Sequence, residues 1–221
     1  MSPRIIFEQE LENLKQKVTD MAERAELSYD RLIVAIRGND RETLKQLLDN
    51  DRQMLDMQRS IEAKCLTLLT KQQPVARDLR LVSSALKVVT DIERVGDHVS
   101  DIAELYLRMG NIYADGSYER LLDEMMEEAK SMLLEGVEAF VNGDEEMAKR
   151  VIDHDDMVDA QFNQMKEMMM QAICNQDLDA DKVVDYLMVA KYLEKIGDHA
   201  VAIGEWAVFL VTGDMQGVEL Y

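Results

Sequence analysis

Two stretches of the sequence place carboxylate side chains inside helix faces that are otherwise apolar. In the first stretch, an apolar stripe with helical spacing leads to Glu93 and, one turn later, to Asp97. In the second stretch, a similar stripe leads to Glu194 and then Asp198. Residues four apart lie on the same helix face. An inward carboxylate costs several kcal/mol unless a proton, a basic side chain or a bound cation compensates it.

Further acids extend each stretch into an acidic patch. Asp51 and Asp155 interrupt two other apolar stripes, and Asp159 follows one turn after Asp155. The candidate metal ligands are therefore Asp51, Glu93, Asp97 and Asp101 in a first acidic patch, and Asp155, Asp159, Glu194 and Asp198 in a second. A metal ion is the compensation that tolerates several carboxylates at once, as in helical bundles with carboxylate-bridged metals. Oxygen ligands suit Mg, Mn, Ca or Fe better than a closed zinc site.

Neighbouring residues refine this prediction. Arg94 and Lys195 directly follow the two glutamates and point about 100° around the helix, so we expect them on the flank of each patch. The alternative is that the acids lie at a bundle edge and face water, but their recurrence at matching positions in both halves favours the metal hypothesis. Gly96 and Gly197 favour the metal hypothesis, because a glycine inside a helix costs about 1 kcal/mol and indicates a close helix approach beside the site.

The three histidines are weaker candidates. His98 and His199 come one residue after the aspartates, so we expect them to point away from the patches. His154 has no counterpart in the other half of the sequence, and we give it no role.

The elements that position these residues are helices. The chain has two prolines and ten glycines in 221 residues, which favours helix over strand. Apolar spacing predicts helices through residues 7–37, 42–71, 74–107, 122–139, 148–169 and 187–208, with the linker in residues 110–116.

The sequence also repeats itself. Residues 86–98 and 187–199 match closely at an offset of 101, and both end in Gly-Asp-His. Such a match indicates an internal duplication. We therefore predict an all-α fold of two tandem three-helix bundles, in residues 1–112 and 117–221.

Composition excludes several classes of function. A net charge of −19 disfavours binding to nucleic acid or to an anionic bilayer. The N-terminal residues have no signal-peptide pattern and no stretch spans a membrane, so we expect a cytoplasmic protein. Cys65 and Cys174 show no disulfide pattern. Since no nucleophile stands with a base, we expect no enzymatic activity.

Three segments, residues 65–80, 92–98 and 193–199, resemble the PhoU family of phosphate-transport accessory and regulatory proteins. The resemblance covers nearly the whole chain. It implies paired three-helix bundles, a homodimer, and metal clusters on the acidic motifs, with iron as the first expectation and Mg, Mn or Zn as alternatives. The first copy departs from the motif at Leu55, where the counterpart of Asp159 is expected, and Ala202 stands where the first copy has Asp101.

The resemblance further implies a negative regulator of the phosphate-starvation response. Such a protein couples the ATPase subunit of a phosphate ABC transporter to a sensor histidine kinase and meets the membrane only through these partners. Two alternatives remain at this point. One is an accessory protein of another phosphate transporter. The other is a ferritin-like carboxylate-metal oxidase, which normally needs Glu-x-x-His pairs that are missing from these motifs.

Overall fold

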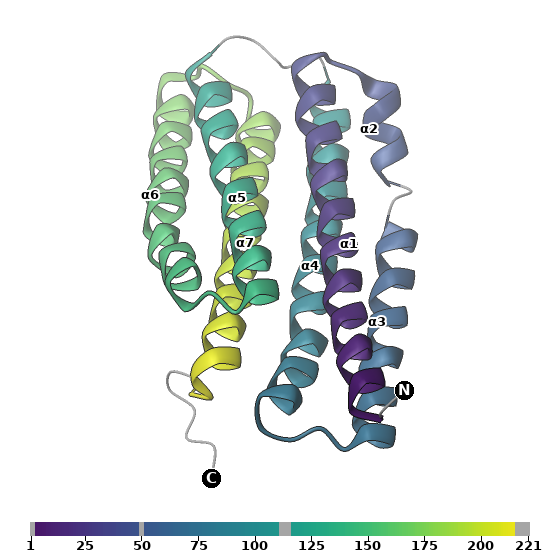
Figure 1. The fold of residues 1–221 in the computed structure, drawn as a ribbon. Coiled ribbons are helices and arrows are strands. Elements are labelled where there is room, and N and C mark those ends of the chain that lie inside the picture. The colour runs from purple at the N-terminus through teal and green to yellow at the C-terminus, as the bar shows by residue number, and fades with distance from the viewer. Residues whose placement is uncertain (1–2, 49–50, 111–115, 215–221) are drawn as a thin grey trace.

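The computed structural model describes residues 3–48, 51–110 and 116–214, which form helices and no strand. The helices are α1 (Pro3–Arg37), α2 (Arg41–Leu48), α3 (Asp51–Gln72), α4 (Ala76–Met109), α5 (Ser117–Asn142), α6 (Glu145–Asn175) and α7 (Ala180–Thr212). Helices α1–α4 form one bundle and α5–α7 form another beside it (Figure 1). The predicted all-α duplicated fold is confirmed.

One expected helix is divided. Apolar spacing predicted a single helix over residues 42–71, but the structure has α2 and α3, on either side of residues 49–50, which lie outside the described residues. Asp40 begins α2 by accepting hydrogen bonds from the backbone of Glu42 and Thr43, each at 3.1 Å. The spacing of apolar residues in the sequence is the same whether or not the helix axis changes direction. The sequence pattern therefore could not separate the two helices.

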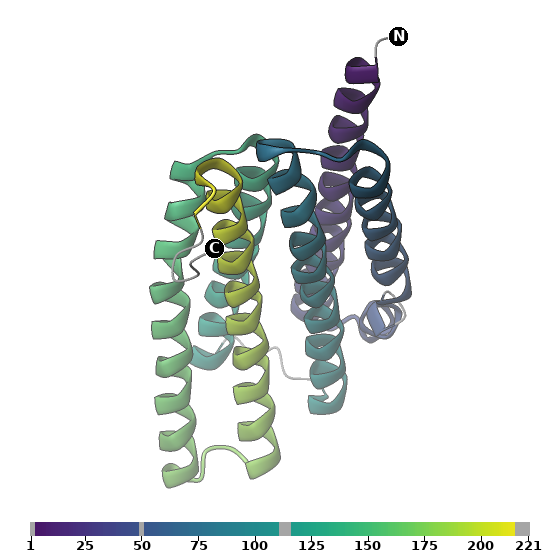
Figure 2. The same ribbon diagram turned by 90° about the horizontal axis from the view of Figure 1, so that it is seen from below.

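Helices α4 and α7 lie at the centre of the molecule. Each packs within its own bundle and also against the other, and the two run in opposite directions (Figure 1). For this reason both helices bury residues on more than one side, Ile92 and Ile102 in α4 and Leu193 and Ala200 in α7 among them. Figure 2 shows the same two-bundle arrangement after a turn of 90° about the horizontal axis.

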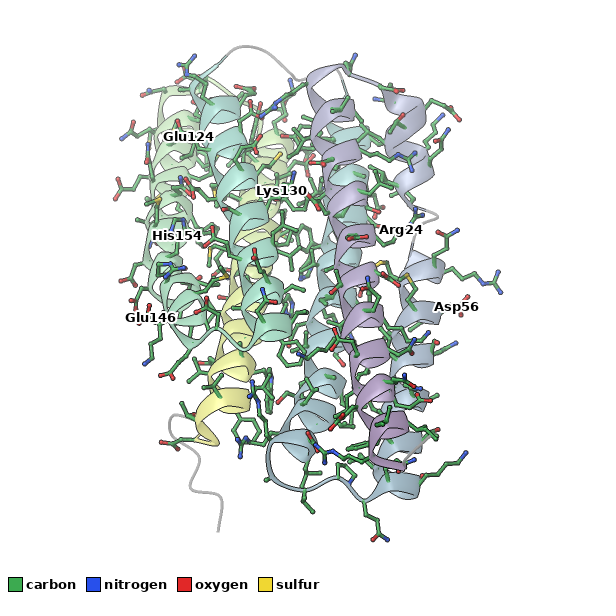
Figure 3. All side chains as sticks on the ribbon, in the orientation of Figure 1. Arg24, Asp56, Glu124, Lys130, Glu146 and His154 are labelled. Atoms are coloured by element: carbon green, nitrogen blue, oxygen red, sulfur yellow. The ribbon has the colours of Figure 1, made fainter. Side chains whose placement is uncertain are left out.

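The repeat interface is the packing of α4 on α7 together with that of α1 on α5. Charged side chains cross it near its edges. Lys130 of α5 donates to Asp30 of α1 at 2.5 Å and lies 3.6 Å from Glu26 (Figure 3). Arg108 of α4 pairs with the buried Asp185 of α7. These contacts fix how the two bundles sit relative to each other.

Candidate metal centre

The second acidic patch lies between α6 and α7. Asp144 starts α6 by accepting a hydrogen bond from the backbone of Met147 at 2.9 Å, and this start sets the position of Asp155 along the helix. Glu194 on α7 is only 8% exposed. Asp155 Oδ1 and Glu194 Oε2 are both buried without a hydrogen-bond partner. Two carboxylate oxygens are therefore left with unused bonding capacity.

The other three carboxyl groups of this patch act on Asp155. Burial raises the pKa of Asp155 to about 6, and the charges of Asp159, Asp198 and Glu194 add to the effect. The structure thus places Asp155 within electrostatic reach of the other three acids that the sequence assigned to the second patch.

Two lysines of α7 provide partial compensation. Lys191 Nζ donates to Glu194 Oε1 at 2.5 Å. Lys195 pairs with Asp198 and lies 3.7 Å from Glu194 Oε2. The hydrogen bond to Asp198 also raises the pKa of Lys195. The expectation that Lys195 stays on the flank was wrong, because its long stem spans one helical turn and carries the ammonium group back to the acids.

The first acidic patch is assembled less fully. Arg94 Nη1 donates to Asp97 Oδ2 at 2.8 Å, and Arg94 Nε lies 3.8 Å from Glu93 Oε2, so the flank expectation was also wrong for Arg94. Asp101 interacts with His98 Nδ1 at 3.4 Å. Asp51 begins α3, but its side chain lies outside the described residues. Leu55, half-buried, stands where a further carboxylate was expected.

Gly96 lies at a close helix approach, as predicted, whereas Gly197 has ordinary contacts with α6. A Cβ atom at Gly197 would lie 3.4 Å from Asp155 Oδ1 and 3.5 Å from Val158. A Cβ atom at Gly96 would lie 3.2 Å from the Met54 side chain. The absence of a side chain at Gly96 therefore lets Met54 of α3 pack closely on α4, whereas the distances at Gly197 are ordinary van der Waals contacts.

The prediction that the histidines point away from the patches was wrong for His98, which contacts Asp101 of the first patch, and His98 and His199 meet at the repeat interface. The rings of His98 and His199 have centroids 5.5 Å apart. His199 Nδ1 lies 3.0 Å from Asp91 Oδ1, a contact between the bundles that the sequence analysis missed. The only feature of the sequence that could have indicated this meeting is that the two histidines stand at equivalent ends of the matching segments, residues 86–98 and 187–199. His154 pairs with Glu128 at 2.7 Å, away from this interface.

The donor chemistry of the second patch suits a metal ion. In the described part of the chain, no three Asp, Glu, His or Cys side chains already stand in an arrangement that would hold a metal. The second patch nevertheless offers hard oxygen donors, and the oxygens of Asp155 and Glu194 without hydrogen-bond partners are buried among like charges. A cation there would satisfy both atoms and remove the repulsion. In the first patch, the described carboxylates already face Arg94 or His98.

Comparison with known proteins assigns the chain to a family. A family model described as the PhoU domain matches it twice, over residues 18–106 and 122–207. This protein belongs to the PhoU family. The phosphate-specific transport system accessory protein PhoU homolog of Clostridium acetobutylicum is 32% identical over 212 residues, covering 95% of this chain and 96% of the relative. The PhoU homolog 1 of Methanothermobacter thermautotrophicus is 28% identical, covering 95% and 96%.

Solved PhoU structures share the fold. The crystal structure of PhoU from Pseudomonas aeruginosa matches with a TM-score of 0.88 at 27% identity, covering 94% of this chain and 100% of that one. The phosphate transport system regulatory protein PhoU from Streptococcus pneumoniae matches with a TM-score of 0.88 at 25% identity, covering 97% and 100%. The two PhoU domain matches confirm the internal duplication, while the exact bounds 1–112 and 117–221 remain predictions.

Proposed function

We propose that this PhoU-family protein is a non-enzymatic accessory regulator of a phosphate-specific transport system. The observation that supports this most directly is the pair of PhoU domains across the chain, together with the printed names of its relatives. The relatives of Clostridium acetobutylicum and Methanothermobacter thermautotrophicus are accessory proteins of such systems, and the Streptococcus pneumoniae protein is a regulatory protein of phosphate transport. Family membership favours this role over a ferritin-like oxidase.

The regulator acts, in this proposal, as a cytoplasmic homodimer between two partners. It binds the ATPase subunit of a phosphate ABC transporter and a sensor histidine kinase, and it restrains the phosphate-starvation response. Family resemblance supports this step. No helix in the described ranges has the length and apolar character needed to cross a bilayer, which is compatible with membrane association through partners only.

The proposal includes a metal ion on the acidic patches, principally on the second. Asp155, Asp159, Glu194 and Asp198 would hold it. The buried oxygens without hydrogen-bond partners support this assignment. Iron is the first expectation from the family, with Mg, Mn and Zn as alternatives. When bound, the ion neutralises the patch and holds α6 to α7.

The regulatory role can be tested in the native host. Deleting the gene should switch on phosphate-starvation genes at high phosphate, and the tagged chain should repress them again and co-purify the transporter ATPase. Recovery of a low-affinity phosphate permease instead would favour the alternative transporter. Normal repression in the deletion strain would contradict the proposal.

The metal assignment can be tested by elemental analysis of purified protein. Glu194→Gln/Asp198→Asn should lose most of the bound metal, and Glu93→Gln/Asp97→Asn should lose less. Glu124→Gln/Glu146→Gln removes two negative charges from exposed positions on α5 and α6 and should retain the metal (Figure 3). All proteins should remain helical by circular dichroism. Equal metal content in the native protein and the Glu194 variant would refute the site.

A further inference from the structure

Two lysines approach the second acidic patch from its solvent side. Lys191 and Lys195 keep 37% and 42% of their side chains exposed, whereas the Glu194 side chain that both contact is only 11% exposed. The carboxylate is therefore fixed within the bundle, while the ammonium groups reach it along flexible stems. Either lysine can turn toward water without moving a helix.

Comparison of the two repeats indicates what the lysines do. Lys195 corresponds to Arg94 at the offset of 101, and both residues pair with patch carboxylates. Lys191 corresponds to Thr90, which is uncharged. The second patch therefore has two basic side chains in contact with its carboxylates, and the equivalent positions of the first repeat provide only one.

Lys191 also has a second favourable contact close by. Its Nζ atom lies 5.1 Å from the centroid of the Phe162 ring on α6. A cation over an aromatic face is stabilised by the ring electrons. When its bond to Glu194 is lost, the ammonium group keeps this contact, so that displacement from the carboxylate is easy.

We propose that Lys191 and Lys195 compete with the metal ion for the second acidic patch. A metal ion binds there by displacing both ammonium groups from Glu194 and Asp198. The reason is electrostatic: a metal ion placed on these oxygens repels ammonium groups at hydrogen-bond distance. The inference rests on the metal site of the proposed function. The two lysines therefore lower the affinity of the site for the metal ion. When a metal ion binds, their ammonium groups move toward solvent beside Phe162.

The test is titration of chelator-treated protein with Mn²⁺ by calorimetry at constant ionic strength. Lys191→Met/Lys195→Met should bind Mn²⁺ about tenfold more tightly than the native protein, on the scale of two partly exposed ion pairs. Lys191→Arg/Lys195→Arg keeps both charges and should stay within about threefold of native affinity.

A matched control removes two other lysines from the same repeat. Lys149 pairs with Glu145, and Lys166 donates to Asn163 and lies 5.4 Å from the same Phe162 ring. Lys149→Met/Lys166→Met gives the same change in net charge without touching a patch carboxylate. Its affinity for Mn²⁺ should rise much less than that of the Lys191/Lys195 variant.

The outcomes separate this inference from the metal site itself. If the native protein binds Mn²⁺ and Lys191→Met/Lys195→Met binds it no more tightly than the control, the competition is refuted while the site remains. If neither protein binds Mn²⁺, both fail. Should the double variant lose its helical circular dichroism, Lys195→Met alone is titrated, with about threefold tighter binding expected and unchanged affinity counting against the inference.

Discussion

The imidazole rings of His98 and His199 face each other across the repeat interface, with 5.5 Å between their centroids and 30° between their planes. The two residues are equivalent at the offset of 101, so the two repeats meet here through matching positions. The equivalence does not extend to their neighbours. His199 pairs with Asp91, whereas His98 packs at 5.3 Å against Tyr192, the residue equivalent to Asp91.

This arrangement predicts that His199 holds the repeats together. His199→Ala should lower the free energy of unfolding by about 1–3 kcal/mol, because it leaves the largely buried Asp91 carboxylate without its partner. His154→Ala is the control, since His154 lies away from the interface, and it should cost clearly less. Urea denaturation followed by circular dichroism measures both. Equal losses of unfolding free energy in the two variants would show that the contact of His199 with Asp91 stabilises the protein no more than a pair away from the interface.

The raised pKa of Asp155 predicts an unusual dependence of stability on pH. Its native value of about 6 lies above the ordinary 3.8, so the native state binds the proton more tightly than the unfolded state. With EDTA present, ionisation of Asp155 should therefore lower the free energy of unfolding progressively as the pH rises from about 4 to about 6. Above that range the full loss should be present.

Asp155→Asn should remove this loss. The variant should be more stable than the native protein in urea at pH 8 with EDTA present, and the difference should shrink by pH 4. Asp156→Asn changes the exposed neighbouring residue and serves as the control. A stability difference independent of pH would contradict the assignment.

Leu55 predicts a gain of function in the first repeat. Leu55→Asp restores the carboxylate that the duplication places opposite Glu93 and Asp97, so it should increase metal bound by the first patch. The measurement is elemental analysis in a Glu194→Gln/Asp198→Asn background, where the second patch is disabled. Gln53→Asp adds the same charge at an exposed position of α3 and should have no such effect. Equal metal content in the two proteins would argue against a ligand position at residue 55.

Two glycines of α7 predict opposite responses to alanine. At Gly204 a Cβ atom would lie 3.2 Å from the backbone oxygen of Ala148, so Gly204→Ala should destabilise the protein by about 1–3 kcal/mol. At Gly197 the contacts are ordinary, and Gly197→Ala should be neutral or stabilising by up to about 1 kcal/mol, because alanine favours helix. Thermal unfolding distinguishes the two variants, and a reversed order would contradict the described packing of α6 on α7.

The cysteines provide a probe of the first bundle. Burial raises the pKa of Cys65 to about 12, whereas Cys174 is exposed. At pH 8 a thiol-specific reagent should therefore modify one cysteine rapidly in the native protein and two after denaturation. Cys174→Ser should leave the native protein almost unreactive, and rapid labelling of that variant would show that α3 is not packed as described.

Much of the fold could be predicted because duplication and apolar spacing are properties of the chain itself. The matching segments at residues 86–98 and 187–199 indicated two equivalent units before any helix was placed. The division of residues 42–71 into α2 and α3 could not be predicted, since Leu44 and Leu47 satisfy the spacing of either arrangement. Only packing against α1 and α4 distinguishes them.

For the acidic patches, the sequence determined which helix faces carry the carboxylates, because four-residue spacing places Glu194 and Asp198 on one side of α7. The tertiary structure decided the rest. It placed Asp155 beside them, buried two oxygens without hydrogen-bond partners, and brought Lys191 and Lys195 back onto the acids. Spacing along a helix is fixed by backbone geometry, whereas burial, pairing and the meeting of His98 with His199 depend on which helices pack together and on the rotamers of long side chains.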